Sequence, residues 1–284
     1  MNCYEFSEYI YGKGTLDGVV DATYLLTMRN SDRKEQYMAQ LKKYRPSKHV
    51  NIVTNQGHTR CKKELCVDNA CKPVDNTNKD ITHATMAIYK HALGKKYDRI
   101  LILEDDCTFS DEFLNKEHAK NIGNKLQVLN NSKYIYRLGG IPFVSLFNGW
   151  YHRYGVVTMA AHAYIINART MQYVSQKQSN IVDIDIQFTM DLSIHNYHYY
   201  MPLAYQLFEV TDNQKNWGNT HNIVLTSIMK LLIWPILFLF KALELDKHPE
   251  PGTSRLYMAN RILYDYMLPI LLLFLVYRFF IERT

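Results

Sequence analysis

The first two thirds of the chain alternate between short apolar runs and stretches in which apolar residues recur every three or four positions. Runs of the first kind predict strands, and stretches of the second kind predict helices. The predicted strands are 22–28, 49–54, 99–106 and 133–140, the predicted helices are 31–44, 80–93 and 111–129, and 162–174 reads as a strand that becomes a helix at about Ala168. Ser31 or Asp32 is expected to cap the first helix. This alternation predicts an α/β fold with a mostly parallel sheet flanked by helices.

A polar stretch rich in Asn, Lys and Cys, residues 55–80, interrupts the alternation and predicts an irregular excursion. It holds Cys61, Cys66 and Cys71 at five-residue intervals, whereas zinc sites usually show closer pairs. A disulfide between Cys66 and Cys71 is one interpretation. Reduced thiols are the favoured one, because an odd number of cysteines and an N-terminus without a secretory signal indicate a reducing compartment.

The composition changes after about residue 222. Segments 223–240 and 262–281 are almost wholly apolar, are close to the ~20 residues that a membrane span needs, and have no polar face. Charged residues interrupt both, with Lys230 in the first and with Asp265 and Arg278 in the second. Two spans, two helices lying in one leaflet and two buried core helices are the alternatives. We expect membrane association, with the α/β part of the chain on the cytosolic side, which for a viral protein is the host-cell cytoplasm.

These patterns divide the 284 residues into three parts: an N-terminal extension (1–20), an α/β domain (21–221) and a membrane-associated helical region (222–284). The formal net charge of +6 suits an anionic ligand or a membrane surface, and equally suits a soluble surface without a charged partner. No nucleic-acid partner is predicted.

Three consecutive carboxylates, Glu104, Asp105 and Asp106, follow the apolar strand 99–106. In an extended strand Glu104 and Asp106 point to one side and Asp105 to the other. Ligands of α/β sheets bind outside the carboxyl ends of the strands. Carboxylates bind Mg²⁺ or Mn²⁺, and substrate phosphates often complete the coordination shell of the ion. The triplet therefore indicates a divalent-cation site that neutralises a diphosphate leaving group. The alternative is an acidic loop exposed to solvent.

The segment ILILEDDCTF (100–109) resembles the Leu-Glu-Asp-Asp-Val motif of glycosyltransferase family 25, which includes lipo-oligosaccharide and collagen galactosyltransferases. Five more segments are similar to elements of that family and follow the same order: 24–41, 82–93, 134–140, 161–171 and 180–188. The resemblance covers about residues 22–215 and implies that the α/β domain (21–221) is the glycosyltransferase catalytic domain. The chain departs from the family in its glycine-threonine element, its cysteine-rich insert and its apolar C-terminal extension, and these departures bear on the identity of the acceptor.

The resemblance implies a GT-A type, Rossmann-like fold and an inverting, metal-dependent transfer of a hexose from a nucleotide sugar, with a UDP-sugar as the natural donor. The acceptor would be a glycan, lipid-linked or protein hydroxyl, and the cofactor Mn²⁺ or Mg²⁺. Asp106 would bind the metal with Glu104, while Glu104 or Asp105 would approach the donor. The remaining donor-binding candidates are Thr27, Arg29, Arg33 and His83. For the arginines the alternative is surface charge, and for His83 a structural role.

Inversion requires a general base at the acceptor hydroxyl. Asp185 and Asp183 both align with the family's Val-Asp segment, with a slight preference for Asp185. The alternative roles are a helix cap and a solvent-exposed carboxylate. His221 is a candidate late metal ligand. The alternative function is a catalytically degenerate, membrane-associated protein that retains a glycosyltransferase-like domain.

Overall fold

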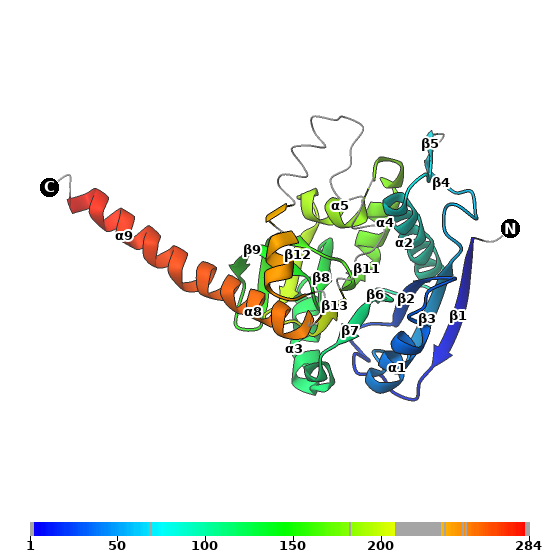
Figure 1. Cartoon of the computed structure of the whole chain (residues 1–284), viewed down its shortest axis with the longest axis horizontal. Helices are drawn as coiled ribbons and strands as arrows, with labels where there is room; N and C mark the ends of the chain where they lie inside the picture. Colours follow the sequence, from blue (N-terminus) through cyan, green and yellow to red (C-terminus); the bar gives the residue numbers. More distant parts are fainter. Residues whose placement is uncertain are drawn as a thin grey trace.

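The computed structural model describes residues 3–68, 70–181, 183–207, 234–235, 237–245, 247 and 249–281. A nine-stranded mixed sheet forms the centre of the described chain, with helices on both faces (Figure 1). Its strands are β1 (Tyr4–Ile10), β2 (Ala22–Met28), β3 (His49–Asn55), β6 (Arg99–Glu104), β8 (Tyr134–Arg137), β9 (Ile141–Phe147), β10 (His152–Met159), β11 (Ala163–Asn167) and β12 (His195–Tyr199). Two small sheets pair β4 (Glu64–Val67) with β5 (Ala70–Pro73) and β7 (Cys107–Phe109) with β13 (Ala204–Gln206).

The strand order in the large sheet is β1-β3-β2-β6-β11-β8-β12-β10-β9. β3, β2, β6, β8, β12 and β9 run in one direction, whereas β1, β11 and β10 run in the other. The sheet is thus mixed, with a parallel β3-β2-β6 unit. Because β2, β3 and β6 are parallel, their carboxyl ends meet at one edge, and this edge carries the acidic triplet.

Two apolar cores form, one on each face of the sheet. The helices that pack on one face are α1 (Lys34–Tyr44) and α3 (Lys116–Val128), preceded by the short η1 (Asp111–Leu114). Those on the other face are α2 (Thr77–Gly94), α4 (Ala168–Ser175) and α5 (Ile184–Met190), with η2 (Gln178–Asn180) between the last two. The central strands β6 and β11 are apolar at nearly every position because both of their faces are covered.

The predicted elements are present with altered boundaries. The predicted helix 111–129 is split into η1 and α3, and Asn115 caps α3. Neither Ser31 nor Asp32 caps the first helix, because α1 begins at Lys34 with Arg33 as its N-cap residue. The strand predicted to end at residue 106 ends at Glu104, so that Asp105 and Asp106 lie in the turn before β7.

The predicted N-terminal extension contributes a strand to the large sheet. β1 pairs antiparallel with β3 along its whole length, from Tyr4 opposite Asn55 to Ile10 opposite His49. Tyr4 and the partly buried Phe6 pack into the core beneath α2. The first residues therefore close one edge of the sheet instead of standing outside the domain.

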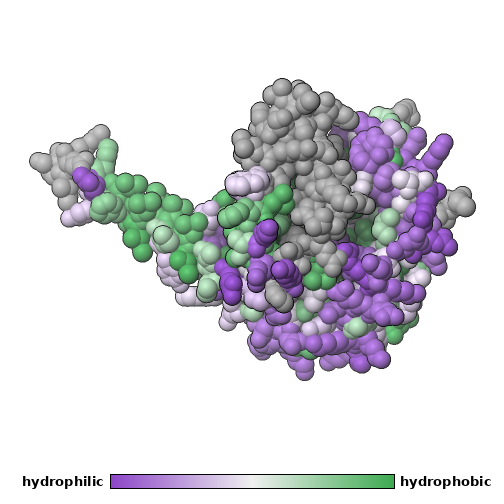
Figure 2. Space-filling model, in the orientation of Figure 1, coloured by the Kyte–Doolittle hydropathy of each residue, from purple (hydrophilic) through white to green (hydrophobic). Residues whose placement is uncertain are grey.

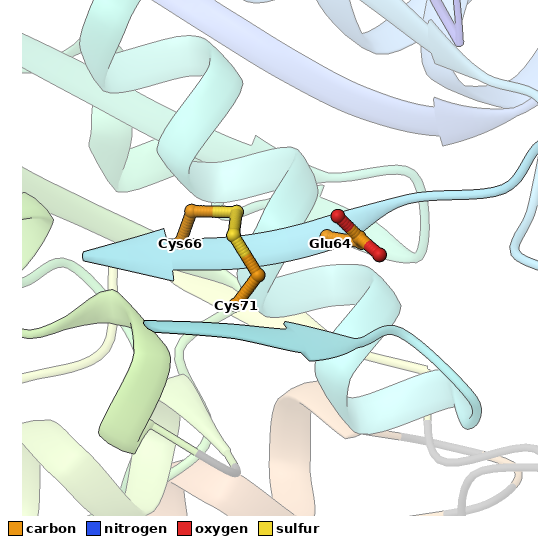
Figure 3. Close-up of side chains that lie close together, drawn as sticks. All are labelled: Glu64, Cys66 and Cys71. Atoms are coloured by element: carbon orange, nitrogen blue, oxygen red, sulfur yellow. A yellow bond between two sulfur atoms is a disulfide. The ribbon is translucent and has the colours of Figure 1, made fainter. Parts of the chain in front are cut away.

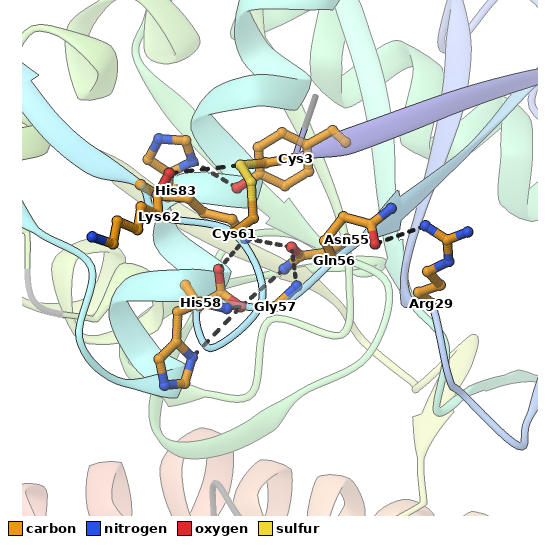
Figure 4. Close-up of a disulfide and its surroundings, with 12 residues drawn as sticks. Cys3, Arg29, Asn55, Gln56, Gly57, His58, Cys61, Lys62 and His83 are labelled. Carbon is orange, nitrogen blue, oxygen red and sulfur yellow. Dashed lines mark hydrogen bonds and ion pairs between the residues drawn. A yellow bond between two sulfur atoms is a disulfide. The ribbon is translucent and has the colours of Figure 1, made fainter. Parts of the chain in front are cut away.

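The interpretation that Cys61, Cys66 and Cys71 are reduced thiols is wrong, because all three form disulfides. Cys3 pairs with Cys61 and Cys66 with Cys71, while Cys107 is free and buried. Cys3–Cys61 joins the start of β1 to the loop after β3 (Figure 4). Cys66–Cys71 joins β4 and β5, so the excursion predicted as irregular contains a cross-linked hairpin (Figure 3).

The C-terminal residues form one long helix, which consists of α8 (Pro249–Arg261), the π-helical turn η3 (Ile262–Met267) and α9 (Leu268–Ile281). α8 packs on β9 and β13, whereas α9 projects from the domain (Figure 1). Within the described part of the chain, residues 249–279 are the one helix that is long and apolar enough to cross a membrane. Most of the first predicted apolar segment, 223–240, lies outside the described residues.

Candidate functional site

The acidic triplet lies at the carboxyl end of β6, between the ends of β2 and β11. Glu104 is the last residue of the strand, and its amide N–H donates to the carbonyl of His162 at the start of β11. Asp105 and Asp106 follow in the turn to β7. The topology therefore places the three carboxylates where an α/β sheet presents residues to a ligand.

Asp105 is held by two residues from the β2–α1 region. The Thr27 hydroxyl donates to Asp105 Oδ2 at 2.7 Å, and Arg33 Nη1 lies 3.3 Å from Asp105 Oδ1. The buried Tyr37 on α1 lies beside the same pair: burial raises its pKa, the Thr27 hydrogen bond opposes that shift, and the Asp105 charge adds to it. The structure thus brings together three of the predicted donor-binding residues, Thr27, Arg33 and Asp105.

Asp106 is buried and only half satisfied. Its Oδ2 accepts from Gln206 Nε2 at 3.1 Å, but its Oδ1 has no hydrogen-bond partner among the described residues. Burial raises the pKa of Asp106 to about 6, while Gln206 opposes the shift and the neighbouring Asp105 charge adds to it. A buried carboxylate oxygen without a donor is costly, so this atom is the part of the edge that calls for a ligand.

Glu104 lies amid other negative charges. Its pKa is raised well above the ordinary value, first by burial and then by the charges of Asp106, Asp185, Asp105 and Asp183. Two arginines are paired with these carboxylates in the structure: Arg33 with Asp105, and Arg137 with Asp185. Among the described residues, these five carboxylates are paired with two guanidinium groups, and a bound cation would favour their ionised forms.

The two candidate general bases occupy different environments at the start of α5. Asp183 is the N-cap of α5, and its Oδ1 accepts from the amides of Asp185 and Ile186. Burial raises the pKa of Asp183, and the charge of Asp185 adds to that shift. Asp185 is engaged at both oxygens, by Arg137 Nη2 at 2.9 Å and by the amide of Ala160 at 2.6 Å.

Arg137, which pairs with Asp185, is fully buried at the end of β8. Its Nη1 donates to Asn196 Oδ1 at 2.7 Å. A buried arginine needs a carboxylate partner, so Asp185 has a structural task that Asp183 does not share.

The other predicted site residues lie elsewhere. Arg29 donates to the Gln56 side chain at 2.9 Å, beyond the ends of β2 and β3, and no described contact links it to the triplet. His83 accepts or donates at Nδ1 with the Tyr4 hydroxyl at 2.6 Å and faces a cavity of about 930 Å³ between α2, β1 and β4. Burial lowers the pKa of His83, and the Lys63 charge adds to that shift. The structure therefore does not join His83 to the acidic edge. His221 lies outside the described residues.

Three residues of this edge were not predicted from the sequence. Gln206 binds Asp106, Tyr37 lies beside Thr27 and Asp105, and His162 is buried next to Gln206. Burial lowers the pKa of His162 to about 4, so its ring is neutral at neutral pH. Only the strand pairings bring Gln206 and His162 to the triplet, and no local pattern marks either of them.

The donor chemistry of the acidic edge fits a hard divalent cation, since carboxylate oxygens are the ligands that Mg²⁺ and Mn²⁺ prefer. Asp106 Oδ1 is the buried oxygen that such an ion would satisfy. Among the described residues, the one group of three potential ligand atoms within 4.8 Å of one another is elsewhere, at Glu64, Cys66 and Cys71. Figure 3 shows that the two sulfur atoms there are bonded to each other, so they are not thiolate ligands.

No family model matches this chain, and no curated protein matches it by sequence. Among solved structures, it is similar to protein A197 from STIV, with 11% identity over 66% of this chain and 85% of that one and a TM-score of 0.42. It is also similar to a glycosyltransferase involved in the glycosylation of the major capsid of PBCV-1, with 8% identity over 74% of this chain and 98% of that one and a TM-score of 0.37. Likenesses this distant do not assign a function to the chain.

Proposed function

We propose that this protein is a divalent-cation-dependent glycosyltransferase that moves a hexose from a nucleotide sugar, a UDP-sugar by preference, to an acceptor hydroxyl with inversion. The observation that carries the proposal is the buried, unpartnered Oδ1 of Asp106 among the carboxylates at the carboxyl edge of β6. A dication together with a sugar diphosphate satisfies that oxygen and balances the charge.

Thr27, Arg33 and Asp105 form the donor side of this proposed site. Arg33 is the N-cap residue of α1, and its guanidinium pairs with Asp105, which also accepts from Thr27. An arginine held in this way suits bidentate contacts with phosphate oxygens. Arg29 stands one loop away and is oriented by Gln56, so it is proposed as an outer contact to the nucleotide.

Asp106 and Glu104 would hold the cation. When bound, such an ion neutralises the diphosphate as it leaves the anomeric carbon. Glu104 has a raised pKa because of burial and the four aspartates, so it binds a cation in competition with a proton. Gln206 donates a hydrogen bond to Asp106 Oδ2, so Asp106 Oδ1 is the oxygen that would bind the cation.

Asp183 is the better candidate for the general base. Its raised pKa suits proton abstraction from a hydroxyl, and its described hydrogen bonds use Oδ1 alone. Asp185, the base preferred from sequence, is instead proposed as a positioning residue, because Arg137 and the Ala160 amide engage both of its oxygens.

The proposed acceptor is a glycan, lipid-linked or protein hydroxyl. A chain with an apolar helix that projects from its catalytic domain suits acceptors at a membrane surface. The competing proposal is a degenerate transferase domain that binds nucleotide without turnover, and no described contact favours it over catalysis.

Hydrolysis of a panel of UDP- and GDP-sugars, measured as released nucleotide with and without Mn²⁺, tests the proposal. We expect Mn²⁺-dependent hydrolysis by the wild type, loss by at least ~10²-fold in Asp106→Asn and in Asp183→Asn, and full activity in Asp111→Asn. Asp111 is a matched control because its carboxylate is exposed and pairs with Lys43 outside the acidic edge. Equal hydrolysis by all four proteins, or none by the wild type with any donor, contradicts the proposal.

A further inference from the structure

The C-terminal helix is fastened to the domain up to Asp265 and leaves it there. Asn260 Nδ2 donates to the carbonyls of Pro142 at 3.0 Å and Phe143 at 3.2 Å. One turn further on, Asp265 pairs with the buried Arg153 of β10. Beyond this ion pair, the apolar side chains of α9 are exposed along the helix (Figure 2). The direction of α9 is therefore set by the sheet, because buried polar bonds hold the helix before it leaves.

The β9–β10 hairpin ends beside the same point. Phe147, the last residue of β9, pairs with Arg153, the residue that holds Asp265. Phe147 is 59% exposed, and Trp150 in the connecting turn is 83% exposed. Their rings meet edge to face at 6.2 Å. A large aromatic pair on the tip of a hairpin is unusual at a surface that faces only water.

Large apolar and aromatic side chains are exposed both where the C-terminal helix leaves the domain and at the tip of the hairpin. Tyr266 and Met267 are the exposed residues that follow Asp265, and Leu146 is exposed beside Phe147. Lys125 donates to Asn148, which stands between Phe147 and Trp150 in the chain, and its ammonium lies over the ring of Tyr197. Aromatic rings with a flanking lysine or arginine are typical of the interface between lipid headgroups and acyl chains.

We propose that the tip of the β9–β10 hairpin, Phe147 to Tyr151, is a second membrane contact, which inserts into the bilayer interface where the C-terminal helix enters it. The occupant is a lipid surface, because the tip is continuous with an apolar helix that has no polar face between Asp265 and Arg278. The hairpin tip and the C-terminal helix would then both contact the membrane. Because polar bonds fix the helix to the domain, the two contacts together would fix the orientation of the catalytic domain on the membrane.

The same helix links the acidic edge to the proposed membrane contact. Tyr205, next to Gln206, contacts Ser254 of α8 at 3.4 Å, and Gln206 binds Asp106. From Ser254 to Tyr266 the helix rises ~18 Å at ~1.5 Å per residue. The level at which α8 meets the Gln206 side of the acidic edge is therefore about 18 Å along the helix from the residues at the proposed membrane contact.

Quenching of tryptophan fluorescence by brominated lipids tests the contact in the full chain. The variant Trp217→Phe/Trp234→Phe leaves Trp150 as the single tryptophan among the three in the chain. On phosphatidylcholine vesicles we expect its emission to shift to shorter wavelength and to be quenched more by bromines high on the acyl chain than by deep ones. The control replaces Trp150 by Phe and Leu192 by Trp in the same background, since Leu192 is 90% exposed and lies after α5, away from the hairpin.

Flotation of the wild type and of Phe147→Ser/Trp150→Ser with the same vesicles is the second measurement. We expect the double variant to partition roughly ten-fold less well, because it loses the burial of two aromatic rings. Three outcomes overturn the proposal: equal partitioning with Trp150 accessible to aqueous iodide on vesicles; failure of the wild type to float; or protection of Trp150 without lipid that rises with protein concentration. The last outcome assigns the hairpin to self-association.

Discussion

Two clusters with buried carboxylates lie at the carboxyl ends of β3 and β6, the two strands that flank β2, and they differ in charge balance. At the end of β3, Asp80 is buried with Lys63, Asn55 and the amide of His58. At the end of β6, Asp106 is buried with one amide donor and with further carboxylates around it. The first cluster pairs its carboxylate with an equally buried cation, and the second does not.

The difference teaches how to separate structural from functional charge in this fold. Both carboxylate oxygens of Asp80 accept hydrogen bonds from other residues of the protein, so this carboxylate needs no ligand. The cluster at the end of β3 has a structural role, since it links α2 to the loop around Cys61. Asp106 keeps a buried oxygen without a described partner. A folded chain tolerates such an atom where a ligand completes it.

Lys63→Met is expected to have the largest effect on stability, because it leaves the Asp80 carboxylate buried without its cation. The expected loss is about 3–5 kcal/mol in the free energy of unfolding, measured by chemical denaturation. Lys62→Met is the matched control, since Lys62 is exposed, and it should change stability by no more than about 0.5 kcal/mol. Equal stability of the two variants would mean that the β3 cluster is not held by its ion pair.

Removal of the Cys3–Cys61 bond should come next. Cys3→Ser/Cys61→Ser opens a loop with a sequence separation of 58, which corresponds to about 4 kcal/mol of chain entropy. Cys66→Ser/Cys71→Ser opens a separation of only 5 and should cost about 2 kcal/mol. Denaturation with and without reductant measures both. If the long loop costs no more than the short one, the N-terminal strand does not depend on its cross-link.

Stability without divalent ions should fall as the pH rises through the pKa of Asp106. The folded-state pKa of about 6 lies above the ordinary value of 3.8, so the folded state binds the proton more tightly than the unfolded chain. The free energy of unfolding is then on the order of 3 kcal/mol lower above pH 6 than below pH 4 from this group alone.

The difference between wild type and Asp106→Asn across this pH range, measured in EDTA, isolates that contribution. The variant should be the more stable of the two at neutral pH. A wild type that is more stable than the variant at neutral pH in EDTA would contradict the claim that the β6 edge lacks a partner for this charge.

The smallest expected change is at Thr27. Thr27→Val removes the hydroxyl that donates to Asp105 and should cost about 1 kcal/mol of stability. If Asp105 orients Arg33 for the donor, the variant should also raise KM for the nucleotide sugar while kcat stays nearly constant. Thr85→Val, which removes a hydroxyl bonded to the α2 backbone, should leave KM unchanged. Identical KM values for both variants would remove Thr27 from the donor side.

The parallel part of the sheet is where sequence-based prediction works best. β2, β3 and β6 are apolar runs because both faces of the sheet are covered, and the covering helices show matching apolar spacing. β1 was missed because it is an edge strand with one face in solvent, so no apolar run marks it. The reversed direction of β11 and the β9–β10 hairpin depend on contacts far apart in sequence, which local periodicity does not encode.

The candidate site could also be predicted only in part. The triplet and its place at a strand end follow from the sequence, as does its proximity to Thr27 and Arg33 on the neighbouring strand end. The roles within the triplet do not, because Gln206 and His162 reach it only through the pairing of β13 with β7 and of β11 with β6. The sequence also gives little basis for choosing between Asp185 and Asp183, because the Arg137 partner of Asp185 is far away along the chain.

In the proposed function, a divalent cation binds the carboxylates at the end of β6. Titration of Mn²⁺ with UDP into the wild type, Asp106→Asn and Asp111→Asn by isothermal calorimetry tests it most directly. We expect one Mn²⁺ site in the wild type and in Asp111→Asn, and a Mn²⁺ affinity at least ~10²-fold lower in Asp106→Asn. Equal Mn²⁺ affinity in the wild type and Asp106→Asn, or no Mn²⁺ binding in the wild type with UDP present, would contradict it.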